Sequence, residues 1–212
     1  MAIKVMISST VRNFGDQIDQ IDTLFQSLGY ETIVSKNGSV FADPRYGNFP
    51  DCLYAVNECD IFFGIVRPDC GSGQIGNYCI TFEEFKKARE LDKPSWFVVD
   101  YRVLYAKELF RILQYKNPNE GKGKLYAKLC SLITHSSNKR DTRVLDLFEP
   151  RDLKEFDPLC LDMLDYVDKK DIDYWSRKNH WRQEYHRLTD ITDYIRKQLG
   201  NQQKVLDVLN EY

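Results

Sequence analysis

The chain is 212 residues long, 42% hydrophobic and 29% charged, with a formal net charge of −2. This length allows one large domain, or a domain with a substantial extension, around a real core. The balanced charge shows no general attraction to nucleic acid or to a membrane surface, so neither is expected as a partner. After Met1 and Ala2 the chain enters a strand pattern without a signal peptide, which predicts a cytoplasmic protein.

The six cysteines and three histidines form no recognisable metal or disulfide pattern. No two cysteines are spaced C-x-x-C, and no cysteine and histidine spacing is typical of zinc. We therefore expect reduced thiols, no metal and no cofactor. Cys70 and Cys79 flank a glycine-rich loop, where they are either reactive thiols or ordinary loop residues.

The first hundred residues alternate between predicted strands and predicted helices. The strands are predicted at residues 3–8, 30–35, 61–66 and 95–100, and the helices at residues 16–28, 51–57 and 81–91. Such alternation predicts a parallel sheet with helices on both faces. We expect the strand order 2-1-3-4, with the first strand in the interior.

The second half of the sequence is predicted to be mainly helical. Helices are predicted at residues 103–115, 125–133, 153–167 and 180–199, a short strand at 143–148, and polar loops at 117–124 and 135–143. The last helix carries an apolar stripe of Trp181, Tyr185, Leu188, Thr192, Ile195 and Leu199. This stripe either packs on the rest of the chain or forms the surface of a homo-oligomer.

Glu84 is the candidate catalytic residue. In the predicted helix at 81–91 it lies about 200° from Phe82, on the apolar side, whereas Glu83 points to water. A carboxylate on the buried side of a first helical turn, just after a glycine-rich loop, is costly unless it has a partner or a task. The alternative is that Glu84 is simply favoured near a helix N-terminus by the helix dipole.

Other candidate residues follow the first and third predicted strands. In an open α/β sheet, ligands bind beyond the carboxyl ends of the strands. Hydroxyl groups, arginines and close backbone suit a nucleotide-like small molecule, and a carboxylate can stabilise the oxocarbenium-like state of glycosidic chemistry. The candidate substrate-binding residues are Ser8, Ser9, Thr10, Arg12, Phe14, Arg67, Gly71 and Thr81.

Three segments together resemble an uncharacterised TIR-like domain family. They are Ile3–Phe14 (IKVMISSTVRNF), Cys52–Ile65 (CLYAVNECDIFFGI) and Cys79–Ala88 (CITFEEFKKA), followed by Lys93 and Pro94. The family is similar to TIR domains and to nucleoside deoxyribosyltransferases, and its pattern S-I-T-x-x-E places the catalytic glutamate at Glu84. The resemblance therefore implies a flavodoxin-like fold, with residues 1–102 as the TIR-like core and residues 103–212 as a mainly helical extension that completes and packs on it.

The resemblance also implies an activity. We expect a hydrolase that cleaves an N-glycosidic bond, with the nicotinamide–ribose bond of NAD as the first candidate and bacterial antiphage defence as the context. NAD would then be a substrate and not a cofactor. Two alternatives stay open: a nucleoside or nucleotide N-glycosidase or deoxyribosyltransferase-like enzyme, and a non-catalytic nucleotide-sensing or assembly module.

Overall fold

A computed structural model describes residues 2–37, 40, 44–45, 48–71, 74–75, 78–114, 157, 159–178 and 181–211. The helix predicted at 125–133, the strand at 143–148 and the loops at 117–124 and 135–143 lie outside these residues. No helix in the described part of the chain is both long enough and apolar enough to span a membrane.

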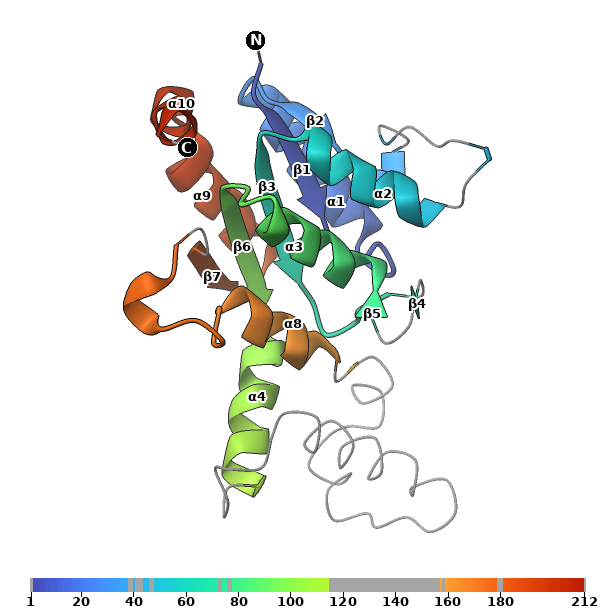
Figure 1. Cartoon of the computed structure of the whole chain (residues 1–212), viewed down its shortest axis with the longest axis vertical. Helices are drawn as coiled ribbons and strands as arrows, with labels where there is room; N and C mark the ends of the chain where they lie inside the picture. The colour runs from blue at the N-terminus through green and yellow to red at the C-terminus, as the bar shows by residue number, and fades with distance from the viewer. Residues whose placement is uncertain are drawn as a thin grey trace.

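Five parallel strands form the central sheet in the order β2-β1-β3-β6-β7 (Figure 1). The strands are β1 (Lys4–Ser8), β2 (Glu31–Ile33), β3 (Ile61–Val66), β6 (Ser95–Asp100) and β7 (Trp181–Tyr185). The four strands predicted in the first hundred residues and their order are confirmed. Together with the helices on both faces, this is a flavodoxin-like three-layer α/β fold with a helical C-terminal part.

Strand β3 lies in the middle of the sheet, and all six of its residues are buried. A strand covered by helices on both faces reads as a continuous apolar run, which is why Ile-Phe-Phe-Gly-Ile-Val lacks alternation. Gly64 is required by close packing, because a Cβ atom there would lie 2.5 Å from the ring of Phe97 on the neighbouring strand.

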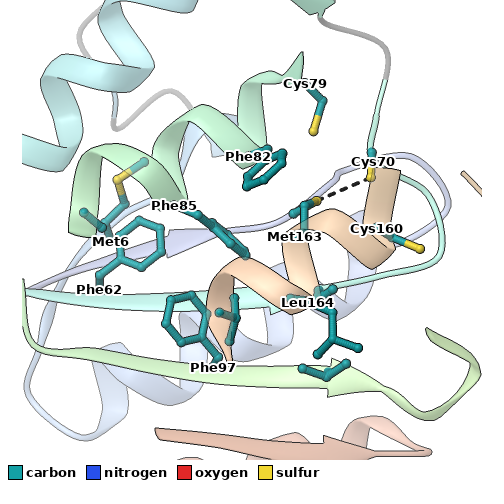
Figure 2. Close-up of a cluster of buried hydrophobic side chains, with 14 of the residues drawn as sticks. Met6, Phe62, Cys70, Cys79, Phe82, Phe85, Phe97, Cys160, Met163 and Leu164 are labelled. Carbon is teal, nitrogen blue, oxygen red and sulfur yellow. Dashed lines mark hydrogen bonds between the residues drawn. The ribbon is translucent and has the colours of Figure 1, made fainter. Parts of the chain in front are cut away.

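Helices cover both faces of the sheet and enclose two buried clusters. The helices are α1 (Gly15–Ser27), α2 (Asn48–Glu58), α3 (Ile80–Glu90), α4 (Tyr101–Gln114), α8 (Leu159–Val167), α9 (Leu188–Leu199) and α10 (Gln202–Asn210). Side chains of α2, α3 and α8 share one cluster, which contains Phe62, Phe85 and Phe97 (Figure 2). Side chains of α1, α9 and α10 share the other, which contains Phe25 and Phe63.

Shorter elements complete the fold. They are the antiparallel pair β4 (Gln74–Ile75) and β5 (Tyr78–Cys79), and two 3-10 turns, η1 (Ser35–Asn37) and η2 (Tyr174–Ser176). Strands β4 and β5 lie within the segment that the sequence predicted as a glycine-rich loop. Strand β7 pairs with β6, and helix α4 begins directly after β6. The central sheet therefore contains strands that come before and after residue 102 in the sequence.

The predicted single helix at 180–199 is wrong in its first part. Residues 181–185 form β7, and only the second part of the prediction is helical, as α9. A spacing of four residues, such as that of Trp181 and Tyr185, fits one face of a strand as well as one face of a helix. The helix starts later because the Asp190 carboxylate accepts hydrogen bonds from the backbone N–H groups of His186 and Arg187, at 2.8 and 2.9 Å.

The apolar stripe packs on the sheet for most of its length. Ile195 and Leu199 are fully buried in the same cluster as α1, and Tyr185 is also buried. Trp181 differs, because 60% of it is exposed. The C-terminal helices are therefore part of the core, while the start of β7 presents an aromatic side chain to solvent.

Candidate active site at the carboxyl edge of the sheet

The candidate site lies where β1 and β3 end. These two strands are neighbours in the middle of the sheet, and chain connections leave them towards β2 on one side and β6 on the other. In this topology ligands bind in the crevice at such a switch point, beyond the carboxyl ends of the strands. Ser8 is the last residue of β1, and Arg67 directly follows β3.

Glu84 lies on the buried side of α3, as the helical wheel predicted, and it points towards the end of β1. Glu84 is 3% exposed, and the Ser8 hydroxyl donates a hydrogen bond to its Oε2 atom. Glu83, one residue earlier, instead forms an ion pair with Lys86 at 2.9 Å. Glu84 is the fifth residue of α3, so it lies beyond the first turn, within which the helix dipole acts. The helix dipole alone therefore does not explain why a carboxyl group is buried at this position.

Burial raises the pKa of Glu84 from its ordinary value of 4.5 to about 7, although hydrogen bonds from Ser8 and Cys52 act in the opposite direction. Cys52 lies on α2, and burial, together with the nearby Glu84, raises the pKa of its thiol to about 12. The thiol is therefore protonated at neutral pH and can donate a hydrogen bond to the carboxyl group. One strand and two helices thus hold a carboxyl group that titrates near neutral pH, a property of general acids and bases.

This pKa predicts how Glu84→Gln changes the free energy of unfolding. The pKa of Glu84 is higher in the folded state than in the unfolded state. Its stabilising contribution to the free energy of unfolding is therefore complete below about pH 4.5 and is lost as the pH rises through 7. Glutamine has no charge to bury and keeps the shape. We expect Glu84→Gln to be more stable than wild type by about 3 kcal/mol at pH 8, with a much smaller difference at pH 4.5.

Urea denaturation at both pH values measures this difference, and Glu83→Gln is the matched control on the outer face of α3. A Glu84→Gln variant whose stability relative to wild type does not change with pH would contradict the assigned environment of Glu84.

Arg67 and Phe14 hold the loop that follows β1. Arg67 Nη1 donates hydrogen bonds to the carbonyl oxygens of Thr10 and Arg12, at 3.0 and 2.8 Å. Its guanidinium group lies 4.4 Å from the centre of the Phe14 ring, a cation–π contact. Both residues are buried. Arg67 Nε is also buried and has no hydrogen-bond partner among the described residues.

The remaining predicted residues surround this loop. The Thr10 hydroxyl donates to the carbonyl oxygen of Asp69 at 2.7 Å, and Gly71 has a φ of +88°, which only glycine adopts without strain. The Arg12 side chain is 71% exposed, and its Nε lies 3.9 Å from an Asp69 carboxylate oxygen. Arg12 is therefore the cation that this loop presents to solvent. Ser9 and Thr81 are buried.

The structure thus brings Ser8 and Glu84 into direct contact and gathers the other residues into a loop assembly beside them. The sequence did not predict two residues that contact the site residues. Cys52 contacts Glu84, and Asp69 contacts Arg12 and Thr10. The predicted helix at 51–57 includes Cys52, but nothing in the sequence indicates its contact with a residue 32 positions away. The pocket beside Trp96 and Trp181 and the small pocket beside Phe85 and Tyr166 do not include Glu84 or another predicted site residue.

Five cysteines lie in the described residues, and all five are buried and free. Cys70 and Cys79, at the ends of the glycine-rich segment, belong to the cluster beneath α3, and Cys70 Sγ lies 3.3 Å from Met163 Sδ on α8 (Figure 2). Their burial fits a structural role that anchors both ends of this segment. Within the described residues, no group of three or more histidine, cysteine or acidic side chains is placed to hold a metal ion.

Residues 4–129 match a family described as a domain of unknown function, DUF4062. The chain belongs to this family. The match begins at β1, extends past α4, and includes every residue of the candidate site. No curated protein matches the chain. Membership of DUF4062 therefore identifies the domain but not its chemistry.

Proposed function

We propose that this DUF4062 domain is a cytoplasmic hydrolase that cleaves the N-glycosidic bond of a nucleotide-like substrate, with Glu84 as the catalytic residue. The observation that supports it most is a carboxyl group with a pKa of about 7, held by Ser8 at the switch point of a flavodoxin-like sheet. The TIR-like motifs at Ser8–Arg12 and around Glu84 make the nicotinamide–ribose bond of NAD the first candidate, and antiphage defence the first biological context.

In this proposal the ionised Glu84 stabilises positive charge on the sugar as the base leaves, and water then attacks the anomeric carbon. A carboxylate held in advance by Ser8 and Cys52 need not reorganise as that charge develops. Arg12, the exposed cation of the loop after β1, is placed to meet a phosphate group. Because Glu84 is 3% exposed, the proposal requires the substrate to open a path to the carboxyl group.

The experiment is an incubation of the purified chain with NAD and, separately, with a panel of nucleosides and nucleotides, followed by chromatography of the free base. We expect nicotinamide to be released from NAD. Release from a nucleoside instead would favour the nucleosidase alternative, and transfer of the sugar to an added second base would favour a deoxyribosyltransferase-like enzyme. A folded protein that releases no base from any of these substrates would contradict the proposed activity.

A non-catalytic nucleotide-sensing or assembly module is the second candidate. The observation in its favour is the closed environment of Glu84, which joins β1, α2 and α3 while it is almost fully buried. Calorimetry with the same compounds separates the two candidates. A sensing module would bind a nucleotide without releasing base, and Glu84→Gln would leave that binding intact.

A further inference from the structure

Strand β7 is an edge of the sheet within the described residues, because β6 is the only described strand that pairs with it. No other described backbone group forms a hydrogen bond with residues 181–185 on the opposite side. Gln183 and Glu184 are exposed. An exposed edge strand is a template for pairing with another chain, and proteins usually protect such edges by covering them or by placing repelling charges on them.

The charges of β7 are complementary to those of a second, antiparallel copy of the same strand. If two β7 strands run antiparallel with Gln183 at a twofold axis, Arg182 of each copy lies opposite Glu184 of the other. Directly opposed residues of unlike charge stabilise an antiparallel pair. Arg182 Nε donates a hydrogen bond to Asp168, and Glu184 Oε1 lies 2.9 Å from His186 Nε2. Among the described residues, this leaves both Nη groups of Arg182 and the second carboxylate oxygen of Glu184 for partners in another copy.

The aromatic side chains at the start of β7 also remain to be covered. All three tryptophans of the protein, Trp96, Trp175 and Trp181, line one pocket of about 990 Å³ at the amino ends of β6 and β7. Trp175 is 88% exposed and Trp181 is 60% exposed. Tryptophan, tyrosine and arginine are enriched in protein interfaces. In the antiparallel arrangement, the end of the second β7 strand runs beside Trp181, next to this pocket.

We propose that β7 is the pairing edge of a homodimer, in which two copies form one continuous sheet across a twofold axis at Gln183. The interface is self-complementary, as a twofold axis requires. It lies at the β7 edge, whereas Glu84 lies beneath the end of β1, so the proposal does not depend on the proposed activity. It also assigns a surface to the homo-oligomer expected from the sequence.

Light scattering after size-exclusion chromatography tests the proposal on the full chain. We expect the wild type to be a dimer, and Glu184→Arg to raise the dimer's Kd by about tenfold or more, because each Arg182 would then face another cation. Glu31→Arg is the matched control, since Glu31 is an exposed residue on β2, at the other edge of the sheet. It should leave the dimer unchanged.

A cross-link tests the register. Opposed residues of an antiparallel pair have Cα atoms about 4.5–5.5 Å apart, within the range of a disulfide. Under mild oxidation, Gln183→Cys should therefore form a covalent dimer on a non-reducing gel, whereas Glu31→Cys should not. A monomeric wild type at high protein concentration would overturn the proposal. So would a dimer that neither responds to Glu184→Arg nor cross-links through position 183.

Discussion

Glu84→Gln is expected to lower turnover by about 10²-fold or more, while the protein stays folded. Glutamine keeps the size and hydrogen-bonding reach of the side chain and removes the charge, which acts mainly in the transition state. The same variant should be more stable than wild type at pH 8, because the burial that raises the pKa of Glu84 opposes its ionised form. Lost turnover together with gained stability is the signature of a charge kept for function.

Glu83→Gln is the control for this result. Glu83 is one residue away and paired with Lys86 on the outer face of α3, so its replacement should leave turnover nearly unchanged. The activity of the wild type should also rise with pH through about 7, as Glu84 ionises. If the two variants change the rate of base release equally, Glu84 is not the catalytic residue.

Deleting residues 176–212 is expected to abolish cooperative unfolding. The deletion removes β7, α9 and α10, and with them Tyr185, Ile191, Ile195 and Leu199, which are at most 4% exposed. Burial of each such side chain contributes about 1.5–3 kcal/mol, so together they approach the whole stability of a typical domain, about 5–15 kcal/mol. Thermal unfolding followed by circular dichroism measures the outcome.

A smaller deletion, of residues 201–212, distinguishes the effect of losing core side chains from the effect of shortening the chain. It removes α10, which contributes one fully packed side chain, Val205, and the hydrogen bond from Gln202 to the Leu28 carbonyl oxygen at 2.8 Å. We expect this variant to fold with a lower melting temperature. If the larger deletion melts cooperatively at the wild-type temperature, the C-terminal elements do not belong to the core that we describe.

The first four strands and the buried orientation of Glu84 could be predicted from local patterns in the sequence. The apolar run at 61–66 is too short for most helices, so its length favoured a buried strand, and the residues of α3 carry a helical period. Local periodicity also separated Glu84 from Glu83: in the structure Glu84 is buried, whereas Glu83 is half-buried and paired with Lys86. These features depend on residues close together in the chain, and for that reason they could be predicted.

Other features depend on contacts between segments that are far apart in the chain. Trp181 and Tyr185 are spaced for either a helix or a strand, and pairing with β6, more than eighty residues earlier, made them a strand. The contact of Cys52 with Glu84 requires α2 and α3 to pack side by side on one face of the sheet. Arg67, which we predict to bind substrate, donates hydrogen bonds to the carbonyl oxygens of Thr10 and Arg12 in the loop after β1, 55 or more residues earlier in the chain. Each outcome depends on a contact between distant segments, which no local pattern encodes.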